Sequence, residues 1–184
     1  MRFLRILVLS AVAVSAVLLG FSLWANTSSP PHPTGTAETA VVEFVIDGDT
    51  VDLIIDGQQE RVRLIGVDTP ESVSRDTPVQ CYGAEASAAL TGLLPINSVV
   101  RIERDAEVRD RFGRVLLYLY RADPTTSDGE IFVNEWLLAN GFADTLFFEP
   151  NTTYRSQFTR SRNTARDAGL GLWGVCEGPD QPLS

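Results

Sequence analysis

The chain has 184 residues, of which 44% are hydrophobic, and its formal net charge at neutral pH is −9. This length fits one folded domain with added segments and not two full domains. The negative charge excludes a protein that coats DNA through a broad basic surface, although an enzyme that gathers a few arginines in one cleft remains compatible with it.

Residues 1–25 are predicted to direct export. Arg2 and Arg5 form a short basic region, and the apolar stretch that follows, up to Trp24, contains no charged residue. This pattern is typical of a signal peptide or of an uncleaved signal anchor. Cleavage after Ala25 and retention in the membrane both stay open. We therefore expect a protein that is secreted or tethered to the outer face of a membrane.

The next segment, residues 26–39, is rich in Ser, Thr, Pro and Gly and is predicted to be a flexible linker. It contains His32, the single histidine of the chain. We expect the folded domain to span residues 40–176 and a short tail to follow at 177–184. The domain therefore lacks a histidine base or ligand. Acid–base chemistry falls to carboxylates, and a bound metal should be a hard cation held by oxygen.

The folded domain begins with three predicted strands. Residues 41–46 are rich in Val and Phe, and residues 50–55 place Val51, Leu53 and Ile55 on one face. Asp56-Gly57 is a strong hairpin signal and leads into a third strand at 60–67. The later elements follow in one series: a helix at 84–94, strands at 99–103 and 115–120, and helices at 134–140 and 154–168.

This order of elements predicts a fold class. Five strands with a helix between the third and the fourth match the arrangement of an OB barrel, so we expect a five-stranded β-barrel with three helices, an α+β structure. OB barrels often bind nucleic acids or sugars, but the fold alone does not assign a function.

Four acidic residues stand at two turns of the predicted meander. Asp47 and Asp49 flank one turn, and Asp68 and Glu71 follow the third strand. A meander can bring both turns to one end of the barrel, where converging carboxylates favour a cation. A calcium-binding EF-hand loop starting at Asp47 is excluded, because it would lack Gly at its sixth position and an acid at its twelfth. Each acid taken alone is equally well explained as a turn residue.

Two arginines are candidates for phosphate binding. Arg63 lies within the third strand and Arg114 opens the fifth. The planar guanidinium donates paired, charge-assisted hydrogen bonds to phosphate. Arg61, Arg101 and Arg104 are instead expected to form surface salt bridges.

Cys81 and Cys176 are the two cysteines of the chain. In an oxidising compartment this pair predicts a disulfide, which would stabilise the fold by about 4–5 kcal/mol in the chain-entropy model. Two unpaired buried thiols are the alternative. Neither cysteine belongs to a CxxC pair, so a structural zinc site is not expected.

An ordered set of motifs between Ala40 and Trp173 resembles the staphylococcal nuclease (thermonuclease) family. No single motif is specific, but their order and spacing together are. The motifs are Asp47-Gly48-Asp49-Thr50-Val51, Arg63-Leu64-Ile65-Gly66-Val67-Asp68-Thr69-Pro70-Glu71, Tyr82-Gly83-Ala84-Glu85-Ala86 and Asp110-Arg111-Phe112-Gly113-Arg114.

The resemblance implies a calcium-dependent phosphodiesterase that hydrolyses DNA and RNA to 3′-phosphate products. Asp49, Asp68 and the backbone carbonyl of Thr69 would be the calcium ligands. Glu71 would activate water as the general base. Arg63 and Arg114 would bind the scissile phosphate and stabilise the charge of the transition state.

The chain departs from the family pattern where substrate is bound. Arg111 and Phe112 replace the common Lys-Tyr, and Phe147 and Phe148 stand where tyrosines commonly line the nucleotide pocket. We expect Arg111, Phe112 and Phe148 to contact substrate. A phenylalanine can stack on a base but has no hydroxyl for a phosphate. Phe147 and Phe148 could equally be core residues.

Two other functions compete with the nuclease. A non-catalytic OB module that binds nucleic acid or protein would be expected to lose Glu71 or the arginine pair, and this chain keeps them. A carbohydrate-binding OB domain would need exposed tryptophans, and Trp136 and Trp173 stand in positions typical of packing. Nothing in the sequence demands more than a monomer.

Overall fold

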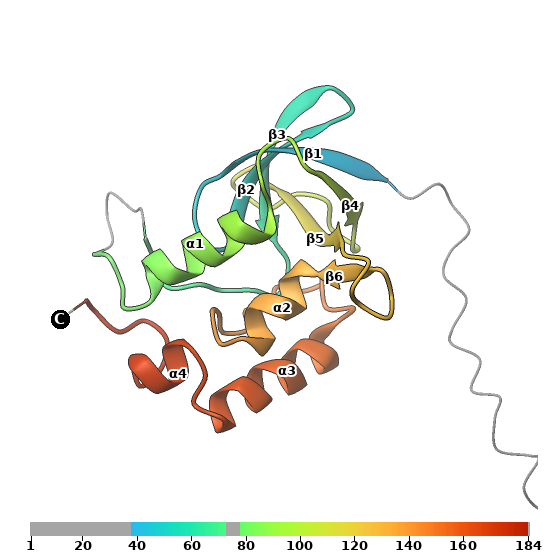
Figure 1. The fold of residues 1–184 in the computed structure, drawn as a ribbon. Coiled ribbons are helices and arrows are strands. Elements are labelled where there is room, and N and C mark those ends of the chain that lie inside the picture. Colours follow the sequence, from blue (N-terminus) through green and yellow to red (C-terminus); the bar gives the residue numbers. More distant parts are fainter. Residues whose placement is uncertain (1–37, 73–77, 184) are drawn as a thin grey trace, which may run out of the picture. The chain divides into compact units, whose positions relative to one another are not determined.

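The computed structural model describes residues 38–72 and 78–183 (Figure 1). The predicted export segment and most of the predicted linker lie outside the described residues. Within the described part of the chain, no helix is long and apolar enough to cross a membrane. The elements are β1 Thr39–Val45, β2 Thr50–Ile55, β3 Gln58–Leu64, α1 Gly83–Leu93, β4 Val99–Glu103, β5 Val115–Ala122, β6 Glu130–Phe132, α2 Val133–Ala139, α3 Arg155–Asp167 and α4 Leu172–Val175.

Five of the strands form a closed barrel. Strand β1 pairs with both β2 and β4, β2 pairs with β3, and β4 pairs with β5, all antiparallel. A parallel pairing of Val62–Leu64 with Val115–Leu117 joins β3 to β5 and closes the ring. The predicted five-stranded OB-like barrel with a helix between β3 and β4 is therefore confirmed.

Local sequence explains the first hairpin. Asp56 and Gly57 both adopt positive φ values, 51° and 78°, and Ile55 pairs directly with Gln58. This two-residue turn has the backbone twist that antiparallel strands favour. The alternating side chains of β2 and its neighbours then point into the barrel, where Val51, Leu53 and Val62 are fully buried.

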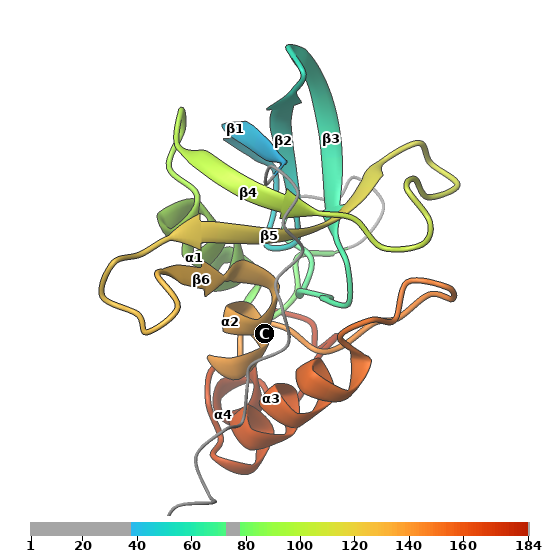
Figure 2. The same cartoon turned by 90° about the vertical axis from the view of Figure 1, so that its right-hand side faces the viewer.

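The helices cover the barrel unequally. Helices α2 and α3 pack against each other and gather with α4 at one end of the barrel, while α1 lies against its side (Figures 1 and 2). Phe158 of α3 is fully buried and its ring packs against those of Tyr118 and Phe132. The three predicted helices are present, and each differs from its predicted bounds by one residue at both ends.

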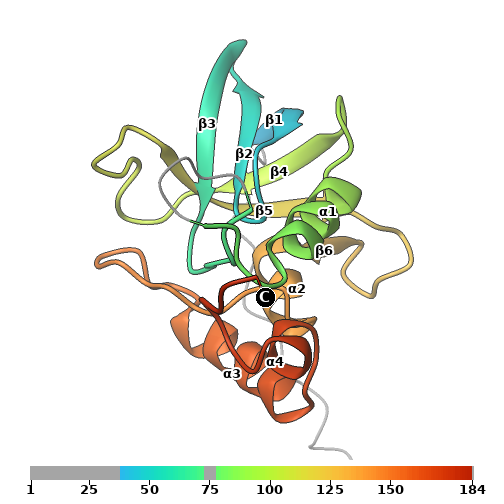
Figure 3. The same cartoon turned by 90° about the vertical axis from the view of Figure 1, so that its left-hand side faces the viewer.

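Two elements were not predicted, and the ends of β1, β3 and β5 differ from the prediction by one to three residues. The short strand β6 was not predicted, because its three residues form a strand only by pairing with Tyr120–Ala122 of β5. The four-residue helix α4 is likewise too short for a periodic signal. Strand β3 ends at Leu64 and not at residue 67, since the chain turns at residues 65–66 and its path leads toward the helices (Figure 3).

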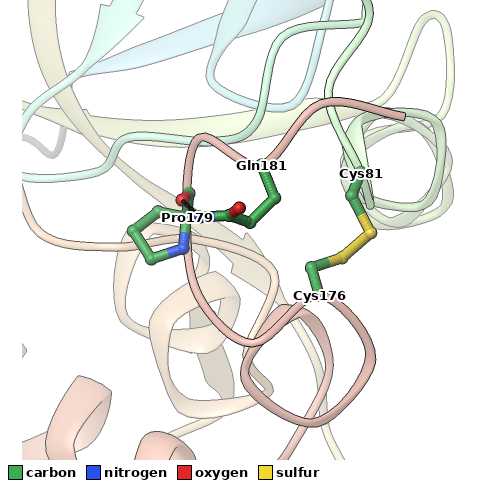
Figure 4. The surroundings of a disulfide bond; sticks show 4 residues. All are labelled: Cys81, Cys176, Pro179 and Gln181. Atoms are coloured by element: carbon green, nitrogen blue, oxygen red, sulfur yellow. Dashed lines mark hydrogen bonds between the residues drawn. A yellow bond between two sulfur atoms is a disulfide. The ribbon is translucent and has the colours of Figure 1, made fainter. Parts of the chain in front are cut away.

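A disulfide joins Cys81, just before α1, to Cys176, just after α4 (Figure 4). The residues beyond it pair with the segment that precedes α1. Cys81 N donates to Gln181 O at 2.8 Å, and Gln80 and Pro182 form an isolated antiparallel bridge. The C-terminal end of the chain is thereby held beside the start of the first helix.

Candidate active site

The six residues expected to perform catalysis and bind a metal line one cavity. Its volume is about 240 Å³, and its walls come from the turn before β2, from β3, from the segment after β3 and from the start of β5. The lining residues are Asp47, Asp49, Thr50, Arg63, Asp68, Thr69, Pro70, Glu71 and Arg114.

Asp49 is fixed by the turn between β1 and β2. It lies directly before β2 and is 7% exposed. Its Oδ2 accepts hydrogen bonds from the backbone N–H and the hydroxyl of Thr69, at 3.0 and 3.2 Å. Its own N–H donates to Asp47 Oδ1 at 3.0 Å. The Asp49 carboxylate therefore connects the first turn of the meander to the segment after β3.

Arg63 occupies the centre of the cavity. Its strand is the one that closes the barrel, and its side chain is 13% exposed, against 54% for Arg61 two residues earlier. The Nη1 of Arg63 donates to the carbonyl of Val67 at 2.5 Å, and its Nη2 lies 3.1 Å from Asp49 Oδ2. The two arginines thus separate as expected: Arg63 points inward, and Arg61 pairs with Asp52 at the surface.

The carboxylates of the cavity are crowded. Partial burial, followed in effect by the neighbouring charge of Asp49, raises the pKa of Asp47 to about 6. Burial also raises the pKa of Asp68 to about 6, although the Arg63 guanidinium opposes the rise. Both shifts arise mainly from burial, with the neighbouring charge of Asp49 adding to each, and a bound cation would favour the ionised form of these carboxyl groups.

Two hydrogen bonds with Gln80 hold the backbone of Glu71. The N–H of Glu71 donates to Gln80 Oε1 at 2.6 Å, and the N–H of Gln80 donates back to the carbonyl of Glu71 at 2.9 Å. The Pro70–Glu71 backbone also packs against Gly83, where a Cβ atom would lie 2.5 Å from the Glu71 oxygen. Gln80 and Gly83 therefore set the place of Glu71 at the cavity wall.

Arg114 stands where the 110–114 turn enters β5. Asp110 accepts from its Nε at 2.7 Å and from its backbone N–H at 2.9 Å. Among the described residues no other hydrogen bond engages this guanidinium, so its terminal nitrogens are available to a ligand. Arg114 lines both this cavity and a second, larger one.

The second cavity has a volume of about 390 Å³ and shares Arg63 and Arg114 with the first. All three residues expected to contact substrate line it: Arg111, Phe112 and Phe148. The Phe112 and Phe148 side chains are each 69% exposed, and the Arg111 guanidinium lies 4.7 Å from the Phe112 ring centre.

Phe147 and Phe148, which could be either core residues or part of the substrate site, differ in their surroundings. Phe148 is exposed and lines the second cavity, so it is not a core residue. Phe147 packs against the core and its ring stacks on Phe158 at 6.3 Å. Of these two neighbouring residues, Phe147 therefore packs against the core and Phe148 lines the cavity.

The donor set of the first cavity fits a hard cation. Asp49, Asp68 and the Thr69 backbone would supply oxygen atoms, which calcium prefers. Within residues 38–72 and 78–183, no three His, Cys, Asp or Glu side chains form a cluster that could hold a metal by themselves. The expected set contains only two carboxylates, so it does not require such a cluster.

Sequence reasoning missed Gln80 and understated Asp110. Gln80 lies in a stretch without a recognisable motif, and its role depends on a contact made by folding. Asp110 belongs to a quoted motif, and its spacing of four residues from Arg114 is the signal that could have identified the pair.

Comparison with known proteins agrees with this geometry. Residues 61–175 match the family model described as staphylococcal nuclease homologue. The chain is 39% identical over 165 residues to a thermonuclease of Staphylococcus intermedius, covering 88% of this chain and 93% of that protein. It is 35% identical over 167 residues to a thermonuclease of Staphylococcus hyicus, covering 88% and 94%.

A third relative comes from another genus. The chain is 38% identical over 135 residues to endonuclease YncB of Bacillus subtilis (strain 168), covering 72% of this chain and 60% of that protein. The family match covers more than half of the chain and the two thermonucleases align along nearly their whole length. This chain therefore belongs to the staphylococcal nuclease family.

Proposed function

We propose that this protein is a calcium-dependent nuclease that hydrolyses DNA, RNA or both and leaves 3′-phosphate ends. The observation that carries the proposal is the joining of two cavities through Arg63 and Arg114. One cavity offers carboxylates, and the other offers exposed aromatic rings. A nucleotide fits this pair, with its phosphate at the shared arginines and its base on the rings.

The arginines bind the scissile phosphate. Arg114 presents its terminal nitrogens while Asp110 holds its Nε. Arg63 presents Nη2, which lies within 3.1 Å of carboxylate oxygens of Asp49 and Asp68. Both guanidinium groups face charge that grows on the phosphoryl oxygens during attack, and fixed donors stabilise such a transition state strongly.

Glu71 acts as the general base. Its carboxylate takes a proton from water as the water oxygen attacks phosphorus, the bond from phosphorus to the 5′ oxygen breaks, and that oxygen takes a proton from solvent. The backbone bonds between Glu71 and Gln80 hold the base at the cavity wall. Such positioning contributes because general-base catalysis requires hydrogen-bond reach.

Asp49, Asp68 and the carbonyl of Thr69 would hold calcium. When bound, calcium supplies positive charge that polarises the phosphate. The gathering of Asp47, Asp49, Asp68 and Glu71 around one cavity supports this assignment, because a cation would reduce the repulsion between their carboxylates.

The aromatic cavity would bind the nucleoside. Phe112 and Phe148 offer rings for stacking, which tolerates any base because every base has a π face. Neither ring carries a hydroxyl, so phosphate binding rests on the arginines. We further propose that residues 1–25 export the protein, to the medium or to the outer face of a membrane, and that it acts as a monomer.

The test is a cleavage assay on single-stranded DNA and RNA with calcium or with a chelator, using the oxidised protein and its Glu71→Gln variant. The expected result is calcium-dependent cleavage to 3′-phosphate ends, lost in the variant. A folded wild-type protein that cleaves none of these substrates would contradict the proposal. It would favour the alternative, a non-catalytic OB module, whose affinity for nucleic acid should then be measured at several salt concentrations.

A further inference from the structure

The C-terminal segment, residues 176–183, lies next to the backbone of the proposed base. Three hydrogen bonds join it to the residues that precede α1: Cys81 N to Gln181 O at 2.8 Å, Leu183 N to Val79 O at 3.3 Å, and Gln80 Nε2 to Asp180 Oδ1 at 3.2 Å. The disulfide adds a covalent link at the same place, as Figure 4 shows.

Gln80 connects this segment to Glu71. Its side chain uses both ends: Oε1 accepts from the Glu71 N–H at 2.6 Å, and Nε2 donates to Asp180. Its own backbone N–H donates to the Glu71 carbonyl. A continuous path of hydrogen bonds therefore runs from the C-terminal segment, through one amide side chain, to the backbone of Glu71.

Both ends of this path are attached to packed parts of the folded domain. Gly83 packs so closely on the Glu71 carbonyl that a Cβ atom there would lie 2.5 Å from it. The disulfide partner Cys176 is 7% exposed and ends a helix whose Leu172 is fully buried. The C-terminal anchor of the path thus belongs to the folded domain, and the contacts at Asp180 extend from it.

We propose that the C-terminal segment positions Glu71 for catalysis, with Gln80 and Asp180 as positioning residues. This inference rests on the proposed function, in which Glu71 is the base. A base that is displaced by about 1 Å loses much of its rate, by up to roughly a hundredfold, even when nothing else in the cavity changes. Substrate binding uses Arg63, Arg114 and the aromatic cavity, so it should be unaffected.

The experiment compares three variants of the full, oxidised chain. Asp180→Ala removes the acceptor for Gln80, and Asp180→Asn restores an acceptor oxygen. Gln181→Ala is the matched control, because within residues 38–72 and 78–183 the one side-chain hydrogen bond of this exposed residue goes to the carbonyl of Pro179, and the Gln181 carbonyl that accepts from Cys81 remains (Figure 4). Each protein is measured for kcat and KM on a DNA oligonucleotide and for hydrogen exchange at the Glu71 amide.

Asp180→Ala is expected to lower kcat by roughly fivefold to tenfold with KM unchanged, and to speed exchange of the Glu71 amide. Asp180→Asn should recover most of the lost kcat and most of the protection of the Glu71 amide. Gln181→Ala should match the wild type in both measurements. A chain ending at Gly178 keeps the disulfide and should show a larger loss than Asp180→Ala. If both Asp180→Ala and the shortened chain match the control in kcat and in exchange, the proposal is wrong.

The two readouts also separate this inference from the proposed function. An inactive wild-type protein would contradict the nuclease proposal, while the exchange of the Glu71 amide would still test the positioning path. Suppose that the wild type is active and Glu71→Gln is inactive, but that the Asp180 and shortened variants keep full activity and full protection of the Glu71 amide. This result would overturn the positioning path and leave the nuclease proposal standing.

Discussion

The Nη2 atom of Arg63 lies 2.9 Å from Oδ1 of Asp68. A proposed phosphate ligand and a proposed calcium ligand therefore form an ion pair with each other. A cation held by Asp68 and Asp49 would compete with the guanidinium for their oxygens and leave Arg63 to the phosphate. We accordingly expect calcium and nucleotide to strengthen each other's binding, since coupling of this kind is reciprocal.

Replacement of Arg63 by lysine should reduce kcat by roughly a hundredfold or more. The guanidinium donates to Leu64, Val67 and the carboxylates at once, and an ammonium group lacks this planar geometry. The measurement is steady-state cleavage of an oligonucleotide, with Arg61→Lys as control because Arg61 pairs with Asp52 at the surface. Equal losses in both variants would argue that the effect is not specific to Arg63, and full activity of Arg63→Lys would argue that charge alone matters.

Calcium should raise the melting temperature of the protein. At a concentration about a hundredfold above its dissociation constant, a ligand stabilises the folded state by about 2.7 kcal/mol. Asp49→Asn and Asp68→Asn should abolish the calcium-dependent shift, and Glu85→Gln, an exposed change on α1, should retain it. A full shift in the Asp68 variant would remove Asp68 from the ligand set.

Removal of the aromatic rings should weaken substrate binding. Phe112→Ala and Phe148→Ala are each expected to raise KM, with kcat much less affected, because base stacking contributes about 1–3 kcal/mol per base. Phe44→Ala is the control, since the Phe44 ring is 55% exposed but lines neither cavity. A KM that moves equally in all three variants would assign the effect to general surface change.

Asp105 should make folding sensitive to acid. Burial alone would raise its pKa, but hydrogen bonds from Tyr118, Thr153 and Ala106 lower the pKa below its usual value. A depressed pKa in the folded state gives stability that is present above the unfolded pKa and lost as pH falls through the folded pKa. In urea unfolding, Asp105→Asn should therefore be less stable than the wild type at pH 6, and the difference should shrink between pH 4 and pH 2. A constant difference would contradict this role.

Two glycines of α1 should respond oppositely to alanine. At Gly83 a Cβ atom would lie 2.5 Å from the Glu71 carbonyl, so Gly83→Ala should lower both stability and activity. At Gly92 nothing lies within 4 Å, and Gly92→Ala should stabilise the helix by about 1 kcal/mol. Thermal unfolding and cleavage rates of both variants test the pair, and a neutral Gly83→Ala would show that the Glu71 backbone can shift at little cost.

The barrel could be predicted because the sequence signals for its strands and turns are local. The Asp56-Gly57 turn and the alternation in β2 depend on neighbours a few residues away, and the structure has both. The residues of the cavity came from a resemblance that covers most of the domain. What could not be predicted depends on distant pairing: β6 exists only against β5, and Gln80 acquires its role only when the chain brings it to Glu71.

The two later phenylalanines illustrate the same limit. A pattern of two consecutive aromatic residues does not say which faces the core, because the segment is neither a helix nor a strand. The ring of Phe147 packs on Phe158, whereas the ring of Phe148 is exposed. Irregular backbone thus conceals which side chain reaches a ligand.

The parallel pairing of β3 with β5 also governs when activity can arise. Arg63 and Arg114 are separated along the chain by α1 and β4, and they meet only after the barrel has closed. A pairing between segments this distant in sequence is expected to form slowly, because the long loop between them must close first. A newly made chain therefore carries every proposed catalytic side chain yet lacks a working site, and the appearance of nuclease activity would report completed folding.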